Sequence, residues 1–126
     1  MSKKILIVED STALRDLVAR ILRHKGYEPL EAKDGYEAMA MILTEHPDLV
    51  LMDLTLPDLS GFDAARRIKA NPTTAQIPIV AYTAWDQQGM RAKARKAGIS
   101  RYLVKPVPAE VLVEVIEDLT MRSEST

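Results

Sequence analysis

The chain has 126 residues, of which 47% are hydrophobic, and its 17 lysine and arginine residues nearly balance 18 acids to give a net charge of -1. This length allows one compact domain and no second one, and the balanced charge provides no general attraction to nucleic acid or an anionic membrane. The absence of cysteine excludes disulfides and thiolate metal sites. No apolar run resembles a signal peptide or a membrane span, so a cytoplasmic location is expected.

Short apolar strands alternate with amphipathic helices along the chain. Continuous apolar runs favour strands that are covered on both faces, and apolar residues spaced by three and four favour helices. Strands are predicted for residues 4–8, 28–32, 48–52, 78–82 and 101–104. Helices are predicted for residues 11–25, 35–45, 62–70, 86–96 and 108–119. Residues 1–121 therefore form the predicted domain, followed by a short, frayed polar tail at 122–126.

This alternation predicts an α/β fold with a doubly wound, five-stranded parallel sheet. Right-handed crossovers place helices on both faces of such a sheet, and the flavodoxin-like strand order 2-1-3-4-5 is the common arrangement at this length. Ligands of these folds bind beyond the carboxyl ends of the strands. Polar residues that directly follow strands are therefore candidates for a functional site.

Five polar residues follow four of the predicted strands: Glu9 and Asp10, Asp53, Thr83 and Lys105. Each has an ordinary structural interpretation by itself, and Asp53, within the stretch VLMDLTLPDLSG, could simply cap the next turn. The predicted topology nevertheless places these strands side by side. The five residues are therefore expected to form one pocket.

The residue types in this pocket indicate a metal-assisted phosphoryl site. Three carboxylates repel one another unless a cation joins them, and donors that are all oxygen select Mg²⁺ (or Mn²⁺) over zinc. With a divalent ion and Lys105 the formal charges sum to zero. A neutralised Asp53 could then attack a phosphoryl donor, because in-line transfer needs mainly positioning and charge stabilisation.

The segments VEDS, MDLTLPDLSG, AYTA and LVKP occur in an order and spacing that resemble the receiver domain of bacterial two-component response regulators, over essentially the whole chain. The resemblance implies that Asp53 is the phosphoacceptor. It also implies that Glu9 and Asp10 hold the metal and that the backbone carbonyl of Thr55 completes the protein ligands. Pro57 and Gly61 would have structural roles in the loop.

The same resemblance assigns roles to residues after the fourth and fifth strands. Thr83 would be the switch hydroxyl and Tyr102 the switch aromatic residue. Lys105 would pair with the phosphoryl group, ahead of a cis bond to the structural residue Pro106. The backbone NH of Ala84 is expected to donate to the phosphoryl group as well.

Two positions that flank the phosphoryl site, Thr55 and Trp85, are expected to tune the lifetime of the phosphorylated state. Trp85 could shield the site from attacking water. It could equally cover the first turn of the fourth helix. The sequence leaves both interpretations open.

By this resemblance, the chain is a phosphoryl-accepting signalling module of a two-component phosphorelay. It would take the phosphoryl group from a phosphohistidine on a histidine kinase or histidine phosphotransfer protein. Its own chemistry would be limited to phosphoryl acceptance and slow autodephosphorylation, so it would not be an enzyme. The surface of the fourth helix, fifth strand and fifth helix would then bind an unidentified downstream protein. No direct contact to nucleic acid or membrane is expected. The expected oligomeric state is a monomer or a weak homodimer.

Alternatives concern the extent of the protein and its class. The chain is either a stand-alone regulator, similar to the CheY and DivK group, or a receiver fragment of a hybrid kinase or longer regulator. A hydrolase of the haloacid dehalogenase type also has a nucleophilic aspartate at a strand end, but the stretch from Asp53 to Thr55 lacks the acid two residues on. A flavodoxin-like cofactor binder would need a phosphate-binding loop where Glu9 and Asp10 stand.

Overall fold

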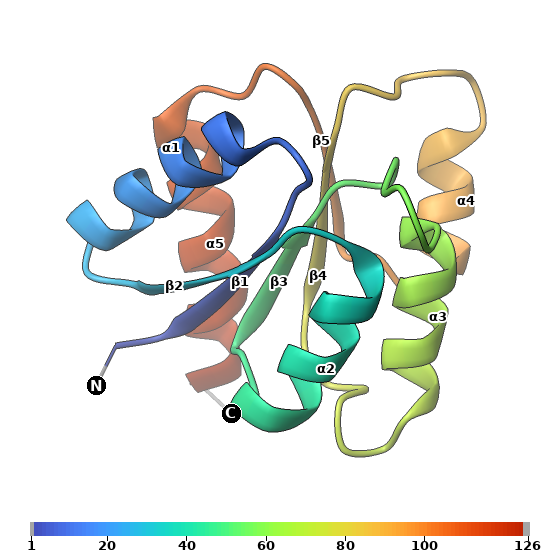
Figure 1. Ribbon diagram of the computed structural model, residues 1–126, viewed down its shortest axis with the longest axis horizontal. Helices are drawn as coiled ribbons and strands as arrows, with labels where there is room; N and C mark the ends of the chain where they lie inside the picture. The colour runs from blue at the N-terminus through green and yellow to red at the C-terminus, as the bar shows by residue number, and fades with distance from the viewer. Residues whose placement is uncertain (1, 125–126) are drawn as a thin grey trace.

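The computed structural model describes residues 2–124, in which five strands alternate with five helices (Figure 1). The strands are β1 (Lys4–Val8), β2 (Glu28–Ala32), β3 (Leu49–Met52), β4 (Ile79–Thr83) and β5 (Arg101–Val104). The helices are α1 (Thr12–His24), α2 (Gly35–Glu45), α3 (Gly61–Ala70), α4 (Met90–Lys96) and α5 (Ala109–Glu124). All neighbouring strands are parallel and their order is β2-β1-β3-β4-β5, so the predicted fold is confirmed.

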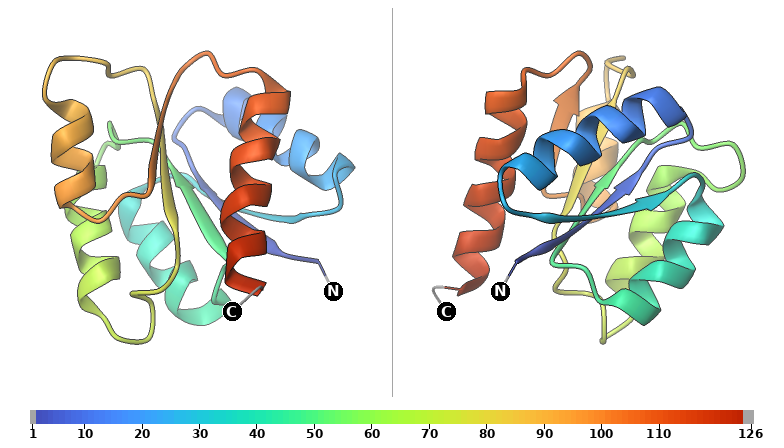
Figure 2. Two further views of the ribbon diagram at one scale, coloured as in Figure 1. Left: turned by 180° about the vertical axis from the view of Figure 1, so that it is seen from behind. Right: turned by 60° about the vertical axis from the view of Figure 1, so that its left-hand side comes forward.

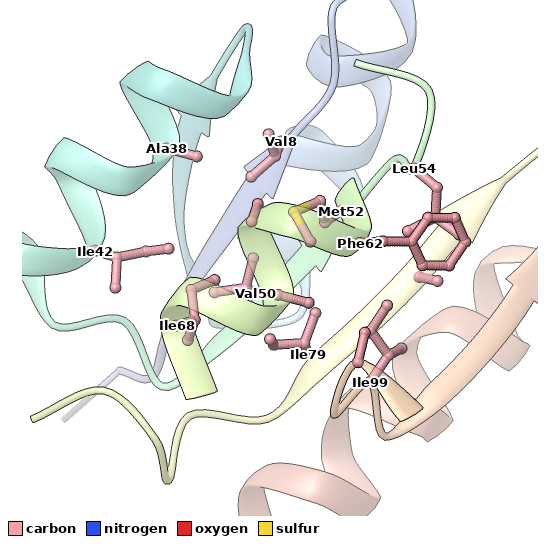
Figure 3. Close-up of a cluster of buried hydrophobic side chains, with 14 of the residues drawn as sticks. Val8, Ala38, Ile42, Val50, Met52, Leu54, Phe62, Ile68, Ile79 and Ile99 are labelled. Carbon is pink, nitrogen blue, oxygen red and sulfur yellow. The ribbon is translucent and has the colours of Figure 1, made fainter. Parts of the chain in front are cut away.

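Helices cover both faces of the sheet, as Figure 1 and the view from behind in Figure 2 show. The face under α2, α3 and α4 buries Val8, Val50 and Ile79 against Ile42 and Ile68 (Figure 3). The face under α1 and α5 buries the alternate strand residues, which include Ile5, Ile7, Leu49, Leu51 and Val80. Since successive side chains of a strand point to opposite faces, a strand covered on both sides must be apolar throughout.

The strands differ in how deeply they are buried. Nearly every residue of β1, β3 and β4 is buried, whereas all four residues of β5, at one edge of the sheet, are only half-buried. The carboxyl ends of β1 and β3 therefore emerge from the best-packed part of the molecule. Within residues 2–124, every helix is too short or too polar to span a bilayer.

Two helix boundaries differ from the sequence predictions by more than one residue. Helix α4 begins at Met90 and not at Asp86, because Gly89 adopts a left-handed conformation with φ of 89° and no side chain caps the helix. Helix α5 continues into the predicted polar tail and ends at Glu124, since no glycine or proline interrupts it there. The predicted polar tail of residues 122–126 thus begins inside α5, and the last two residues, 125 and 126, lie outside the described residues.

Candidate functional site

Three carboxylates meet at the carboxyl ends of β1 and β3. Glu9 and Asp10 directly follow β1, Asp53 directly follows β3, and the two strands are neighbours in the sheet. One oxygen of each carboxylate lies within 4.8 Å of the others. Glu9 and Asp53 are each only 5% exposed, whereas Asp10 is exposed. The predicted acid cluster thus exists, with one open side.

Lys105 enters this acid cluster from the end of β5. Its Nζ donates to Glu9 Oε1 at 2.5 Å and to Asp53 Oδ2 at 3.0 Å. The backbone NH of Lys105 donates to the Thr83 carbonyl at 2.9 Å, which continues the pairing of β4 and β5 beyond the last strand residue. The peptide bond from Lys105 to Pro106 is cis, as predicted.

Burial and hydrogen bonding give the two buried acids opposite properties. Burial raises the pKa of Glu9, and hydrogen bonds from Lys105 and the Ser11 NH offset this only in part, so its pKa is above the ordinary value. Burial also raises the pKa of Asp53, but hydrogen bonds from the Thr55 NH and Lys105 outweigh it, and the pKa is below the ordinary value. Asp53 is therefore held as a carboxylate.

The lysine is held in its charged form by the same contacts. Burial lowers the pKa of Lys105, but the hydrogen bonds to Glu9 and Asp53 outweigh this effect and raise the pKa above its ordinary value. One ammonium group faces three carboxylates, which leaves two formal negative charges in the pocket. A divalent cation would neutralise them.

Asp53 is also bonded to its own loop. Its Oδ1 accepts hydrogen bonds from the Thr55 NH at 3.0 Å and from the Thr55 hydroxyl at 2.9 Å. Asp53 therefore caps the turn with one carboxylate oxygen and contacts Lys105 in the acid cluster with the other. Its role as a turn cap is thus compatible with a place in a functional site. The sequence analysis missed the Thr55 hydroxyl, although a hydroxyl side chain two residues after an aspartate is a common turn pattern.

Four other predicted residues lie on or directly after β4 and β5. The buried Thr83 hydroxyl accepts a hydrogen bond from the Trp85 NH at 3.3 Å. The Trp85 ring stacks on Phe62 of α3, with ring centroids 6.5 Å apart and an interplanar angle of 20°. The Tyr102 hydroxyl donates a hydrogen bond to the Trp85 carbonyl. Ala84, which lies between Thr83 and Trp85 in the sequence, is exposed.

The loop after β3 has a close approach that requires glycine. The NH of Gly61 donates to the Leu54 carbonyl at 3.2 Å. A Cβ atom on Gly61 would lie 2.7 Å from the Cα of Leu54, which no side chain could tolerate without a backbone shift. Pro57 lies exposed in the same loop. Both residues thus belong to the turn that leads away from Asp53.

A second aspartate of this loop was not singled out by the sequence analysis. Asp58 accepts hydrogen bonds from the NH groups of Gly35 at 2.9 Å and Tyr36 at 3.0 Å, at the beginning of α2. Backbone NH groups at the first turn of a helix have no partner inside the helix, so a carboxylate there stabilises it. Through this contact, the loop that contains Asp53 and Asp58 is hydrogen-bonded to the beginning of α2.

Arg15 is another residue that the sequence analysis missed. Its Nη1 donates to the backbone carbonyl of Glu9 at 2.7 Å, and its Nε donates to Glu31 Oε1 at 3.3 Å. The side chain is only 16% exposed. Arg15 thus links α1, the end of β1 and β2, and no local sequence pattern signals a contact between three separate elements.

Comparison with known proteins identifies the family. Residues 5–117 match the family model of the response regulator receiver domain. The chain therefore belongs to this family and is a receiver domain of a two-component system, which is a signalling module.

Individual relatives agree in sequence and structure. The polar-differentiation response regulator DivK of Brucella ovis is 32% identical over 117 residues, which cover 93% of this chain and 95% of DivK. A CheY-like receiver domain protein from Methanospirillum hungatei matches with a TM-score of 0.93 and 30% identity over 99% of this chain and 98% of that one. The receiver domain of the sensor histidine kinase PA1611 from Pseudomonas aeruginosa, solved with magnesium in its active site cleft, matches with a TM-score of 0.87 and 32% identity over 95% and 98%.

Proposed function

We propose that Asp53 accepts a phosphoryl group from a phosphohistidine on a histidine kinase or histidine phosphotransfer protein, in a step that depends on Mg²⁺ or Mn²⁺. The phosphorylated form then binds a downstream protein through the surface of α4, β5 and α5. The observation that carries this proposal is the Lys105 ammonium shared between Asp53 and Glu9, beside the exposed Asp10. Receiver domains as a family interact with histidine kinases and downstream targets, which supports it.

The donor set of the acid cluster fits magnesium. All three side chains offer carboxylate oxygens, which this ion prefers, and they carry two formal negative charges more than Lys105 compensates. Glu9, Asp10 and Asp53 would hold the ion, together with the backbone carbonyl of Thr55. The bound ion would supply positive charge next to the phosphoryl oxygens. The magnesium in the cleft of the PA1611 receiver domain supports this assignment.

The residues of the chain itself perform the remaining parts of the transfer. Asp53, ionised because of its low pKa, forms the new oxygen to phosphorus bond while the bond from phosphorus to the donor imidazole breaks and the imidazole keeps the electron pair. The Lys105 ammonium, already beside Asp53, pairs with the phosphoryl oxygens. The Ala84 NH donates to the same oxygens.

The hydrogen bonds to the phosphoryl group are strong enough to operate a switch. Moving a two-state equilibrium from mostly inactive to mostly active takes about 5.5 kcal/mol, and each charge-assisted hydrogen bond contributes about 1.5 to 3 kcal/mol. Bonds from Thr83, Lys105 and the Ala84 NH together contribute about 4.5 to 9 kcal/mol, a range that includes this requirement. The Thr83 hydroxyl and the Tyr102 hydroxyl both bond to the backbone of Trp85, which supports a coupled movement of the two side chains.

The test is intact-mass measurement after incubation with acetyl phosphate, with and without Mg²⁺. The parent is expected to gain one phosphoryl group only with the metal, and Asp53→Asn is expected to gain none. Asp63→Asn, which changes an exposed acid of α3, is the matched control and should behave as the parent does. Equal gain by Asp53→Asn would overturn the proposal, as would the absence of transfer from both acetyl phosphate and a phosphorylated histidine kinase.

A further inference from the structure

A groove between α4 and β5 is lined by arginine side chains. It has a volume of about 300 Å³, with Arg91, Arg95 and Arg101 around it. Ala94, which is 1% exposed, and Ile99, which is 6% exposed, form an apolar floor. The groove is therefore both positively charged and able to receive an apolar group.

The positive charge of this groove exceeds what the stability of α4 requires. The helix reads MRAKARK and carries four basic residues and no acid, although the whole chain has a net charge of -1. Basic residues in the last turn stabilise a helix through its dipole, but Arg91 lies in the first turn, where a positive charge is unfavourable. Helix stability thus does not account for Arg91.

The arginines of the groove are available to an external carboxylate. Among the side chains of residues 2–121, Arg95 has no ion-pair or hydrogen-bond partner. Arg91 pairs with Asp86 at 3.4 Å and Arg101 with Asp118 at 2.8 Å, with exposed fractions between 37% and 59% for the four side chains. Exposed pairs of this kind contribute only about 0 to 1 kcal/mol, so a partner that offers several carboxylates can replace them.

We propose that this groove binds an acidic, partly apolar segment of a downstream protein. The inference rests on the proposed function and specifies the chemistry of the partner. Arg91 and Arg95 are four positions apart on one face of α4, so they are separated by about 6 Å along the helix axis. Carboxylates separated by four residues on a partner helix match this spacing. Arg101 takes a further carboxylate, and an apolar side chain between the acids rests on the floor of the groove.

The charges around the groove favour a short acidic segment over a nucleic acid. Asp86 and Asp118 stand next to the arginines and would repel a polyanion that runs past the groove in both directions. The apolar floor also offers nothing to a phosphate backbone. A short protein segment with a few acids does not extend past Asp86 and Asp118, and its apolar residue can pack on the floor of the groove.

Tyr102 connects the groove to the phosphorylation site. The Arg91 guanidinium lies 4.9 Å from the centre of the Tyr102 ring, and Arg91 Nη1 donates to the Tyr102 carbonyl at 3.3 Å. The hydroxyl of the same ring bonds to the Trp85 carbonyl, next to Thr83. A movement of the ring toward Thr83 after phosphorylation removes it from beneath Arg91 and frees the guanidinium for the partner. Phosphorylation is therefore expected to strengthen binding.

The experiment measures fluorescence anisotropy of a labelled helical peptide that carries glutamates four residues apart with leucines between them. The parent is measured with and without acetyl phosphate and Mg²⁺, beside Arg95→Glu and the matched control Arg67→Glu, which changes an exposed arginine of α3. We expect phosphorylation to lower Kd for the parent about tenfold and Arg95→Glu to raise it about tenfold, with Arg67→Glu within about twofold of the parent. A peptide with lysine in place of glutamate is expected not to bind.

Several results would overturn the groove proposal. One is an equal weakening of peptide binding by Arg95→Glu and Arg67→Glu, and another is the absence of any binding by the acidic peptide. A third is binding of an oligothymidylate that is as tight as that of the peptide and depends on Arg95, which would identify a nucleic acid as the occupant. A dimer of the parent that Arg95→Glu dissociates and that the acidic peptide leaves intact would identify a second copy of the chain instead.

Intact-mass measurement on the same samples separates this proposal from the proposed function. A protein that is phosphorylated on Asp53 but binds the peptide with unchanged affinity retains its receiver chemistry and overturns the groove proposal. A protein that acquires no phosphoryl group from acetyl phosphate or from a phosphorylated histidine kinase, but binds the peptide in an Arg95-dependent manner, supports the groove and contradicts the phosphoryl chemistry.

Discussion

The acid cluster and the region of α4 are built in opposite ways, although both adjoin the same sheet. Glu9 and Asp53 follow buried strands, and each has a hydrogen bond on both carboxylate oxygens. Helix α4 has seven residues, begins after Gly89 without a side-chain cap, and adjoins the half-buried edge strand β5. The acid cluster thus has the fixed geometry that the proposed phosphoryl transfer would need, and α4 has the weaker support expected of a surface that would change.

The largest expected effect comes from truncating the core beneath the acid cluster. Leu51 is 1% exposed and precedes Asp53 by two residues in the well-packed region. Leu51→Ala is expected to lower the free energy of unfolding by about 2 to 5 kcal/mol, because it leaves a cavity. Urea denaturation measures this loss. Leu17→Ala, at a position that is 50% exposed, is the control and should cost less than about 1 kcal/mol; equal losses would contradict the difference in packing.

Magnesium is expected to give the next largest effect, through the acid cluster alone. At a concentration of about 100 times Kd, the ion should raise the free energy of unfolding of the parent by about 2.7 kcal/mol. Asp10→Asn should lose most of this gain. Without metal it should be at least as stable as the parent, since it removes one of three mutually repelling carboxylates.

Thermal denaturation with Mg²⁺ and with EDTA measures both effects of Asp10→Asn. Asp63→Asn is the control, because it removes an equal charge from α3 and should keep the full magnesium shift. If Asp10→Asn responded to magnesium as the parent does, the ion would lie elsewhere.

A smaller effect is expected at the contact between β5 and the loop before α4. Tyr102→Phe removes the hydroxyl that donates to the Trp85 carbonyl, which should cost about 0.5 to 1.5 kcal/mol. Because α4 belongs to the less stable region, faster hydrogen exchange should be confined largely to residues 84–90. The fluorescence of Trp85, the one tryptophan of the chain, gives a second measurement. Tyr36→Phe, at an exposed position of α2, should change neither quantity.

The smallest effect concerns the pH dependence of the loop that carries Asp53. Burial raises the pKa of Asp58, but hydrogen bonds from the Tyr36 and Gly35 NH groups outweigh it and hold the pKa below the ordinary value of 3.8. A carboxyl group with a lowered pKa in the folded state stabilises the fold above its unfolded-state pKa, and this contribution is lost as the pH falls through the folded-state value.

The parent should therefore have a higher Tm than Asp58→Ala near neutral pH, and the difference should shrink once the pH falls below 3.8. Calorimetry across this range checks the direction. Asp63→Ala, which removes an exposed acid of α3, is the control. A Tm difference that stays constant down to the lowest pH would mean that Asp58 acts through its shape and not through its charge.

Most of the fold and the centre of the site could be predicted because they depend on regular patterns. Alternating strands and helices predict a parallel sheet, and the carboxyl ends of parallel strands share one edge. Glu9, Asp53 and Lys105 were therefore expected together although they are far apart in the chain. The start of α4 was predicted wrongly, because the polar residues Gln87 and Gln88 fit a helix and only the backbone conformation of Gly89 shows that they precede it.

The amino-acid sequence by itself determined the order of the elements, the strand arrangement and the edge at which the acids gather. These features follow from the spacing of apolar residues and from the handedness of connections, which act along the chain. Only the tertiary structure decided that Trp85 stacks on Phe62, that Arg15 holds the Glu9 carbonyl and that three arginines surround one groove. Such contacts join side chains from separate elements, and their geometry depends on how those elements pack.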